Sequence, residues 1–332
     1  MSESSAPEVE PFAEPWLRPY LDFAGRAFGA HAYQADERYT RWLYDENPHG
    51  AASDGAVVID GGHVIGCLNK IRLLWHLDGQ RQLVATVHNL YVQPESRSGL
   101  GAMLVLHAMR GEAAIFIPGA VDTVAAMYEK LRWPSIEARW FRLLSPSVTG
   151  ALHAITGRAA MYDSLARSAM RITAAPTEEP IDACIEAFNR VATGAVMRPY
   201  WTRETFVWRF FHRLGPRHVL ASLDRRAFAL FSCGVRKGIR IARLIDAAYD
   251  DPQDFVSLLQ WAAKLLARRG ALLAWSYSSR AELNDVIAKL GWHPIENAPR
   301  SFLYRRRVSS ATPAAVNASA GDFGFESILD HR

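Results

Sequence analysis

The sequence predicts an α+β protein of two tandem halves with one topology, each a mixed, mostly antiparallel central sheet flanked by helices. Apolar runs that alternate as strands do are interleaved with segments of helical spacing along the chain. The order of these segments repeats, and YEKLRW at 128–133 is matched by IAKLGW at 287–292, an offset of 159 residues (287 minus 128). An apolar fraction of 49% and a charged fraction of 22% are ordinary for a globular protein.

The first half opens with an acidic stretch at residues 1–15, which we expect to be a disordered tail. Residues 17–43 have helical spacing, and DENPHG at 45–50 marks a turn. Strands follow at 56–60, 63–77 and 81–92, the last two joined by the hairpin signal DGQ. The first half is completed by a helix to residue 110, a strand at 113–118, a helix at 122–133 and a strand at 135–144. Asp122 is expected to be the N-cap of the second of these helices. We therefore place an N-terminal domain at residues 16–150.

The second half repeats this order after TAAPTEEP at 173–180, which is typical of a linker, so residues 151–180 are assigned as a linker region. We expect helices at 181–191, 202–213, 254–269 and 280–290, and strands at 217–223, 227–238, 239–249, 271–278 and 301–307. The second domain is placed at residues 181–307, and the small, polar residues 308–332 are expected to form a tail.

Composition excludes several functional classes. The three cysteines include no C-x-x-C pair, so neither a metal site nor a disulfide framework is indicated. No signal peptide and no run of about 18 apolar residues is present, so we expect a cytoplasmic protein without a membrane partner. The net charge of +4 suits an acidic ligand without requiring one. Without a recognition motif or a concentrated basic stripe, no nucleic acid partner is expected.

Two glycines, Gly99 and Gly101, lie at the start of the helix that follows the strand ending at Val92. Glycine in a helix costs about 0.5–1 kcal/mol relative to alanine, so two of them need a reason. Small residues there let successive backbone N–H groups point into one concavity at a helix N-terminus, which binds phosphate. The alternative is a tight loop without a ligand. The spacing is neither the dinucleotide fingerprint nor a P-loop.

The run NLYVQPESRSGLGAMLV at 89–105 resembles the strand, loop and helix of the GNAT superfamily of N-acyltransferases, whose Q/R-x-x-G-x-G/A loop holds the pyrophosphate of coenzyme A. The frame here is Ser96 to Gly101, with Ser96 in place of Gln or Arg. NPHG at 47–50, KLRW at 130–133 and YWTRETFVWRF at 200–210 fit GNAT proteins with two tandem halves, over about residues 35–306. The resemblance implies a GNAT-type N-acetyltransferase that moves an acetyl or other acyl group from acetyl-CoA or another acyl-CoA to a primary amine of a small molecule, by direct attack in a ternary complex.

The resemblance also assigns roles to residues. Tyr128 stands where a tyrosine protonates the coenzyme A sulfur, and His88 stands where arylalkylamine acetyltransferases carry a histidine that acts as base. Their alternatives are a packed helix tyrosine and a histidine that holds a loop carbonyl, with Thr86 and Asn89 orienting a water instead. A backbone N–H near Val92 would stabilise the oxyanion. The residues that would bind the cofactor are Leu90, Tyr91 and Val92 along the pantetheine arm, and Arg97, Ser98, Gly99, Leu100, Gly101 and Ala102 around the phosphates.

The second half lacks these features. No glycine loop follows the strand ending at Tyr249, and Ile287 stands in the position of Tyr128. We therefore expect this half to shape the acceptor pocket or to complete the fold. Two alternatives stay open: basic clusters at 225–226, 236–237 and 305–307 that dock an acyl carrier protein as the donor, or a non-catalytic acyl-CoA-binding protein. The sequence does not identify the amine acceptor, the acyl chain length or the oligomeric state.

Overall fold

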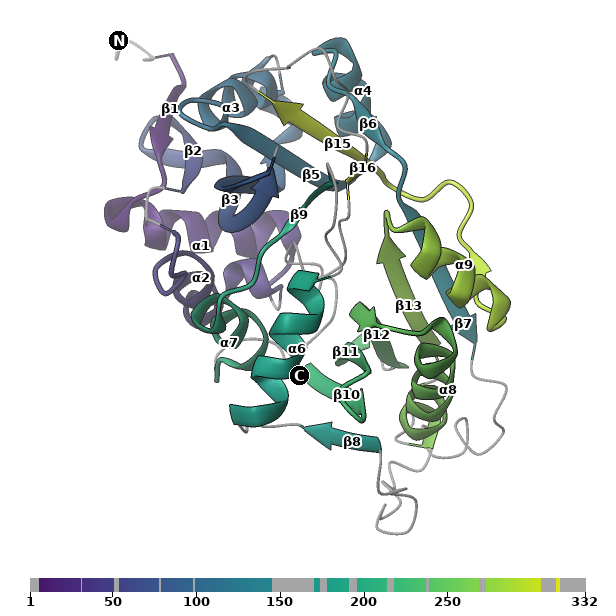
Figure 1. The fold of residues 1–332 in the computed structure, drawn as a ribbon. Coiled ribbons are helices and arrows are strands. Elements are labelled where there is room, and N and C mark those ends of the chain that lie inside the picture. The colour runs from purple at the N-terminus through teal and green to yellow at the C-terminus, as the bar shows by residue number, and fades with distance from the viewer. Residues whose placement is uncertain are drawn as a thin grey trace. The chain divides into compact units, whose positions relative to one another are not determined.

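The computed structural model of the 332-residue chain forms two compact units that do not follow chain order (Figure 1). Unit 1 contains Met1–Trp75, Arg81–Ile136 and Pro299–Thr312, and unit 2 contains His76–Gln80, Glu137–Ala298 and Pro313–Arg332. The residues that the structure describes are 6–30, 32–50, 54–77, 79–97, 99–144, 170–173, 178–190, 196–213, 218–236, 239–268, 271, 273–305 and 315–316.

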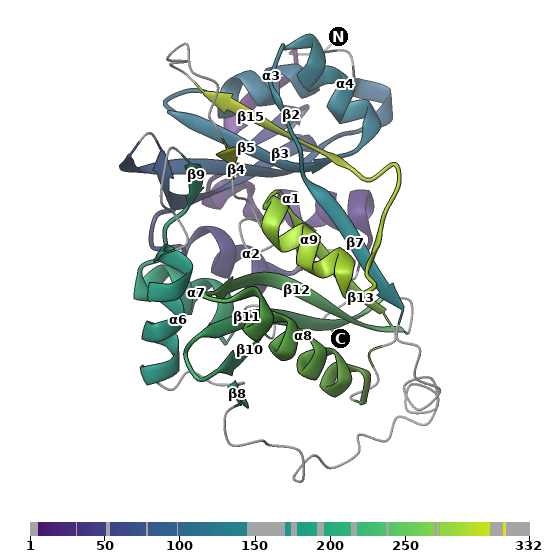
Figure 2. The ribbon, with the colours of Figure 1, turned by 45° about the vertical axis from the view of Figure 1, so that its right-hand side comes forward.

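Unit 1 is built on one mixed sheet with helices on both faces (Figure 2). Its strands, in spatial order, are β1 (Glu8–Pro11), β2 (Gly55–Asp60), β3 (His63–Leu77), β4 (Gln80–Val92), β5 (Ala114–Ala120), β15 (Arg300–Arg305) and β6 (Ser135–Ile136). β4 and β5 run parallel, whereas β1–β2, β2–β3, β5–β15 and β15–β6 are antiparallel. One face carries α1 (Glu14–Phe28), the short turn η1 (Tyr33–Ala35) and α2 (Glu37–Tyr44), and the other carries α3 (Leu100–Ala108) and α4 (Asp122–Lys130).

Local sequence explains the helices that cover the α1–α2 face. The buried residues of α1 recur at helical spacing, with Leu17, Tyr20, Leu21 and Ala24 on one stripe. α2 begins at a capping aspartate, because the Asp36 carboxylate accepts hydrogen bonds from the backbone N–H groups of the helix's first turn. These stripes place α1 and α2 on the sheet.

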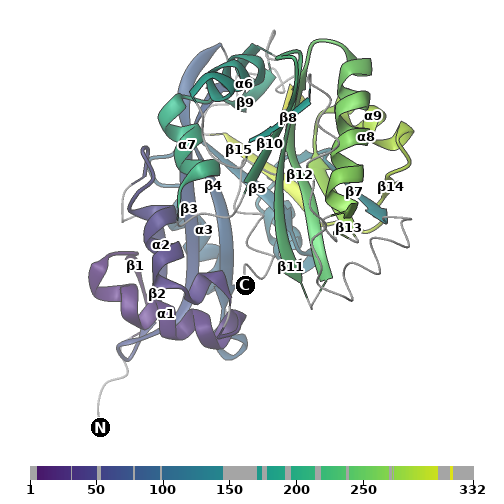
Figure 3. The ribbon, with the colours of Figure 1, turned by 90° about the horizontal axis from the view of Figure 1, so that it is seen from below.

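Unit 2 is a second mixed sheet with helices on both faces (Figure 3). Helices α8 (Pro252–Arg268) and α9 (Ala281–Lys289) pack on one face through a shared apolar cluster, and α6 (Glu178–Arg190) and α7 (Arg203–Phe211) lie on the other side. β9 (Val196–Pro199) pairs in parallel with β16 (Ala315–Val316). The main sheet has the order β14 (His293–Pro294), β7 (Arg139–Leu144), β13 (Leu273–Ser278), β12 (Ile239–Tyr249), β11 (Ala227–Arg236), β10 (His218–Leu223) and β8 (Met170–Thr173). The predicted α+β class, with two mixed sheets flanked by helices, is confirmed.

The two halves of the sequence exchange their final strands. The strand predicted at 135–144 is split, because β6 pairs with β15 in unit 1 whereas β7 pairs with β13 in unit 2. The strand predicted at the end of the second half, β15, pairs with β5 in unit 1. Alternating apolar residues identify a strand but not its neighbour, so sequence order alone assigned β7 and β15 to the wrong sheets and β6 to the right one.

Two local predictions were wrong, and the helical spacing at 17–43 divides into separate helices. Residues 1–15 were expected to form a tail, but Glu8–Pro11 is β1, an edge strand paired with β2, and α1 begins at Glu14. The helical segment at 17–43 is two helices, because α1 ends at Gly29 with φ +113°, a conformation that favours glycine. Asp122 is the first residue of α4 rather than its N-cap, which is Val121.

Some predictions fall on residues that the structure does not describe. They are most of the linker at 151–180 and all of the tail except 315–316. Among the helices that are described, none is long and apolar enough to span a bilayer.

We expect a fragment that ends at Leu144 to be insoluble. It lacks β15, whose Phe302 and Leu303 are buried to 0% and 3% exposure in the core of unit 1. Burial of two such side chains contributes about 3–6 kcal/mol to the free energy of unfolding, which is roughly 5–15 kcal/mol for a whole domain. Co-expression with a fragment from residue 145 onward should restore a soluble complex that co-elutes in size-exclusion chromatography. A soluble 1–144 fragment with cooperative melting would contradict the exchange.

Candidate active site

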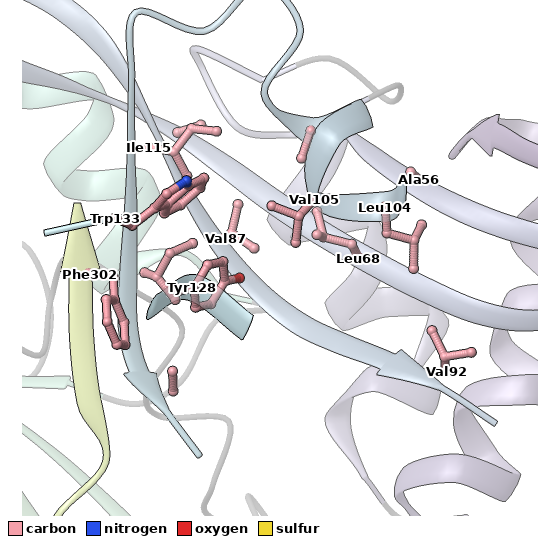
Figure 4. Packing of buried hydrophobic residues seen from close by; sticks show 14 of the residues in the cluster. Ala56, Leu68, Val87, Val92, Leu104, Val105, Ile115, Tyr128, Trp133 and Phe302 are labelled. Atoms are coloured by element: carbon pink, nitrogen blue, oxygen red, sulfur yellow. The ribbon is translucent and has the colours of Figure 1, made fainter. Parts of the chain in front are cut away.

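The parallel strands β4 and β5 separate after a short contact. They are in register only at Ala85↔Ile115 and Thr86↔Phe116, and beyond these pairs they diverge (Figure 4). β5 stays paired to β15 along its other edge. Residues 87–92 of β4 therefore lose β5 as a ladder partner, although buried backbone groups need one. Such an edge is suited to an extended ligand that adds like a strand.

β4 contains a bulge at Asn89, where the strand leaves β5. Asn89 has φ +56°, in the left-handed region. The alternation of side chains also shifts there: Ala85 and Val87 point into the core cluster before it, and Leu90 and Val92 do so after it. One extra residue therefore turns the backbone within the unpaired part of β4.

The glycine loop forms the N-terminus of α3. Gly99 is the N-cap with φ +83°, so a left-handed backbone explains this glycine. Gly101 lies in the first turn, and a Cβ added there meets no atom within 4 Å, so internal packing does not require glycine at this position. The space in front of Gly101 is what a ligand approaching the helix N-terminus would use.

The remaining loop residues take distinct places. Arg97 is exposed, and its Nε donates to the Val92 carbonyl over 3.3 Å, which ties the loop to the end of β4. Leu100 is buried in the core, and Ala102 is half-buried. Ser98 lies outside the described residues.

Tyr128 lies on α4, beside the diverging strands. It is 1% exposed, stacks on Trp133 with ring centroids 4.9 Å apart, and contacts Phe302 at 5.4 Å. Its phenol oxygen points away from Phe302, toward β4 (Figure 4). Burial raises the pKa of the phenol, so the hydroxyl keeps its proton at neutral pH. The arrangement is that of a protonated acid held rigidly beside the open edge of β4.

His88 lies on the opposite face of β4, toward α2. Its Nε2 is 2.7 Å from the Tyr44 hydroxyl, and the two rings are stacked at 10°. Burial raises the pKa of Tyr44 well above its ordinary value, so this phenol stays neutral, and the direction of its hydrogen bond with Nε2 follows the tautomer of His88. In the tautomer whose Nε2–H donates to the phenol oxygen, Nδ1 carries the lone pair that a base requires. The imidazole is thus fixed in orientation, half-buried, on the α1–α2 side of the sheet.

The three consecutive residues predicted to line the cofactor are brought together at the end of β4. Leu90 and Val92 anchor in the core on the side of α3 and α4. Tyr91 faces α1, where its ring lies 5.9 Å from Phe23 and 5.4 Å from Phe28. The backbone between these anchors is therefore held from both faces.

Two groups around the site were not predicted from the sequence. Tyr44, which holds His88, lies 44 residues away in the chain, in a helix whose partner strand no local pattern reveals. Phe302 and Tyr304 pack on Tyr128 and Trp133, but they come from the exchanged strand β15. The alternation of SFLYR marks these two rings as one face of a strand, and only the strand's placement was missing.

In unit 2, the strands that correspond to β4 and β5 are β12 and β13, and a side chain hydrogen-bonds to the end of β12. β12 pairs with β13 from Ile241↔Leu273 to Leu244↔Ser276 and then continues to Tyr249 with β11 on one edge and no β13 residue on the other. Arg280, 6% exposed at the start of α9, donates from Nη1 to the Ala247 carbonyl over 2.5 Å. Its guanidinium also lies 3.4 Å from the Asp246 carboxylate. The part of β12 beyond its last pair with β13 is thus already hydrogen-bonded by a side chain of the same unit.

The sequence matches no protein-family model, and no curated protein is similar in sequence. The fold, in contrast, is shared with solved structures. N-myristoyltransferase of Saccharomyces cerevisiae with bound myristoyl-CoA aligns with a TM-score of 0.64 at 12% identity, over 95% of this chain and 87% of that one. A GCN5-related N-acetyltransferase from Kribbella flavida aligns with a TM-score of 0.56 at 17% identity, over 91% and 71% of the two chains. One from Anabaena variabilis aligns with a TM-score of 0.57 at 11% identity, over 90% and 72%.

These alignments confirm the predicted fold. The chain has a tandem GNAT-like fold, and the likeness extends over nearly its full length. At this level of identity the shared property is the fold, so the chemistry must be argued from the residues of unit 1.

The two loop glycines should respond oppositely to alanine. Gly99→Ala forces a side chain into a left-handed backbone and should destabilise the protein by about 1 kcal/mol. Gly101→Ala adds a methyl group in open space within a helix and should stabilise it by about 0.5–1 kcal/mol. Denaturant unfolding of both variants measures the difference, and equal effects would contradict the loop geometry.

Proposed function

We propose that the chain is an N-acyltransferase that moves an acetyl or other acyl group from acyl-CoA to a primary amine of a small molecule, with the chemistry in unit 1. The observation that carries this proposal is the divergence of β4 from β5 between a glycine helix N-terminus and the buried, protonated Tyr128. The structural neighbours, an N-myristoyltransferase with bound myristoyl-CoA and two GCN5-related N-acetyltransferases, support it.

The binding of the acyl donor follows from backbone chemistry. The backbone N–H groups of Leu90 and Val92 face the edge that β5 has left, since the N–H of Tyr91 points to Cys67 on β3, and they are available to the amide groups of a pantetheine arm. The N–H groups at the start of α3, next to Gly99 and Gly101, face outward where the helix dipole favours a pyrophosphate. Both contacts use the main chain, which is why Ser96 in place of Gln or Arg is compatible with the loop.

The chemical step balances as a direct transfer. The neutral amine nitrogen attacks the thioester carbonyl carbon, and backbone N–H groups near Val92 donate to the oxygen that becomes negative. When the C–S bond breaks, the sulfur keeps the electron pair and receives a proton from Tyr128. His88 removes the proton of the attacking nitrogen, so the products are an amide and a free thiol. The proton on His88 then replaces, through solvent, the one lost by Tyr128.

We propose that the rest of the second half completes the fold or shapes the pocket for the amine acceptor. Arg280 bonds the part of β12 that would otherwise take a cofactor arm, and Ile287 is an apolar, fully buried residue in the place of Tyr128. A single acyl-CoA site per chain is therefore proposed, within the N-terminal domain at 16–150 as completed by β15. Of the basic clusters considered for docking an acyl carrier protein, residues 237 and 306–307 lie outside the described residues, and that donor stays an alternative prediction.

Tyr128→Phe tests the function and its acid together. Wild-type protein with acetyl-CoA, screened against an amine library for release of free thiol, should acetylate at least one primary amine. Removing the hydroxyl keeps the ring contacts with Trp133 and Phe302, so the variant should fold and turn over on the order of 10²-fold more slowly. No transfer by wild-type protein to any amine would contradict the function, and wild-type turnover by the variant, where chemistry limits the rate, would remove Tyr128 from the mechanism.

His88 should determine the acidic limb of the pH–rate profile. A general base must be neutral, so kcat/KM should fall as pH falls through the titration of an imidazole, between about pH 5 and 8. His88→Ala should remove this limb, whereas Tyr44→Phe, which deletes only the 2.7 Å contact to Nε2, should shift it. An unchanged limb in His88→Ala would assign the base to another group or to water.

A further inference from the structure

Asn89 joins two parts of unit 1 that are distant in sequence. Its Oδ1 accepts hydrogen bonds from the Tyr33 hydroxyl at 2.9 Å and from the Gln34 Nε2 at 3.2 Å. Both donors belong to η1, the turn between α1 and α2 on the face that carries His88. The acceptor lies on the bulge of β4, where the strand has left β5.

The backbone of the bulge is held as well. The Cys67 thiol, fully buried on β3, donates to the Asn89 carbonyl over 3.2 Å. Burial raises the pKa of Cys67, so the thiol keeps the proton that this bond needs. Two donors on Oδ1 define the orientation of the carboxamide, and its Nδ2 is buried without a partner among the described residues. Among the described residues, the side chain of Asn89 is therefore held through Oδ1 alone.

Conformational preference does not account for these contacts. Asparagine tolerates φ +56° better than most residues, and this would explain its presence in any isolated bulge. That preference needs no partner, however, and Asn297, at φ +53° in unit 2, is exposed. The donors to Asn89 lie 55 and 56 residues away in the chain and converge on the one position where β4 turns its N–H groups toward the acyl site.

We infer that Asn89 is a positioning residue that couples the η1 turn to the β4 bulge, and so orients the backbone N–H groups of Leu90 and Val92 toward the acyl carbonyl. This inference rests on the proposed acyl transfer for its catalytic consequence, but not for the coupling itself. A change in η1, on the face of the sheet that carries His88, is transmitted through Oδ1 to the groups that stabilise the oxyanion.

A double-mutant cycle tests the catalytic consequence. Asn89→Gly removes the side chain but suits the left-handed backbone, and Tyr33→Phe removes one donor. With acetyl-CoA and an amine accepted by the wild-type protein, each variant should lower kcat by at least ~10-fold with little change in the KM for acetyl-CoA. Tyr33→Phe should have no further effect in the Asn89→Gly background. Additive effects on kcat, or an unchanged kcat, would overturn the positioning role.

Backbone hydrogen exchange tests the coupling without any turnover, so a failure of the proposed function leaves this arm decisive. The amides of Leu90 to Val92 should exchange at least ~10-fold faster in Asn89→Gly and in Tyr33→Phe, with no additional increase in the double variant. Asn297→Gly is the matched control, the same change at an equivalent φ in unit 2, and should leave these amides unchanged. Unaltered exchange of Leu90 to Val92 in Asn89→Gly, or the same acceleration in Asn297→Gly, would contradict the coupling.

Discussion

The structure of unit 1 depends on how the two edges of β5 are used. One edge is paired along its length with β15, from the far end of the chain, and the other is released by β4 after two residue pairs. The first edge closes the core over Tyr128 and Trp133 with Phe302 and Tyr304. The second leaves an unpaired stretch of β4 next to the helix N-terminus at Gly99. The two edges of β5 thus have different uses: one completes the core, and the other ends beside the free edge of β4.

The second half of the sequence contributes directly to the core of unit 1. Its last strand supplies the side chains that pack against Tyr128, while β7 of the first half completes the other sheet. In unit 2, Arg280 bonds β12 beyond its last pair with β13, and the buried guanidinium is balanced by Asp246 and by carbonyl oxygen. An acyl-CoA arm would have to displace a charged, bonded side chain there, and in unit 1 it would displace none that the described residues show.

Sequence patterns predicted much of this fold because they report local preferences. The bounds of β3 and β12 and the start of α4 follow from alternation and helical spacing. The two loop glycines could be singled out because glycine destabilises a helix and therefore needs a reason there. Properties set by distant partners were not predictable: the neighbour of β15, the Tyr44–His88 contact and the tether at Asn89 all join residues more than 40 positions apart. Asn89 was visible only as one polar residue near His88, since nothing local signals its left-handed backbone.

We propose that the end of β4 in unit 1, beyond its pairs with β5, binds an acyl-CoA arm, and that its counterpart in unit 2 does not. Hydrogen exchange of the wild-type protein with and without coenzyme A, read by mass spectrometry of peptides, measures this directly. When coenzyme A is bound, we expect slower backbone exchange at residues 87–92 and at the start of α3, and no change at residues 245–249. Unchanged exchange at 87–92 with saturating coenzyme A, or equal protection of 245–249, would contradict it.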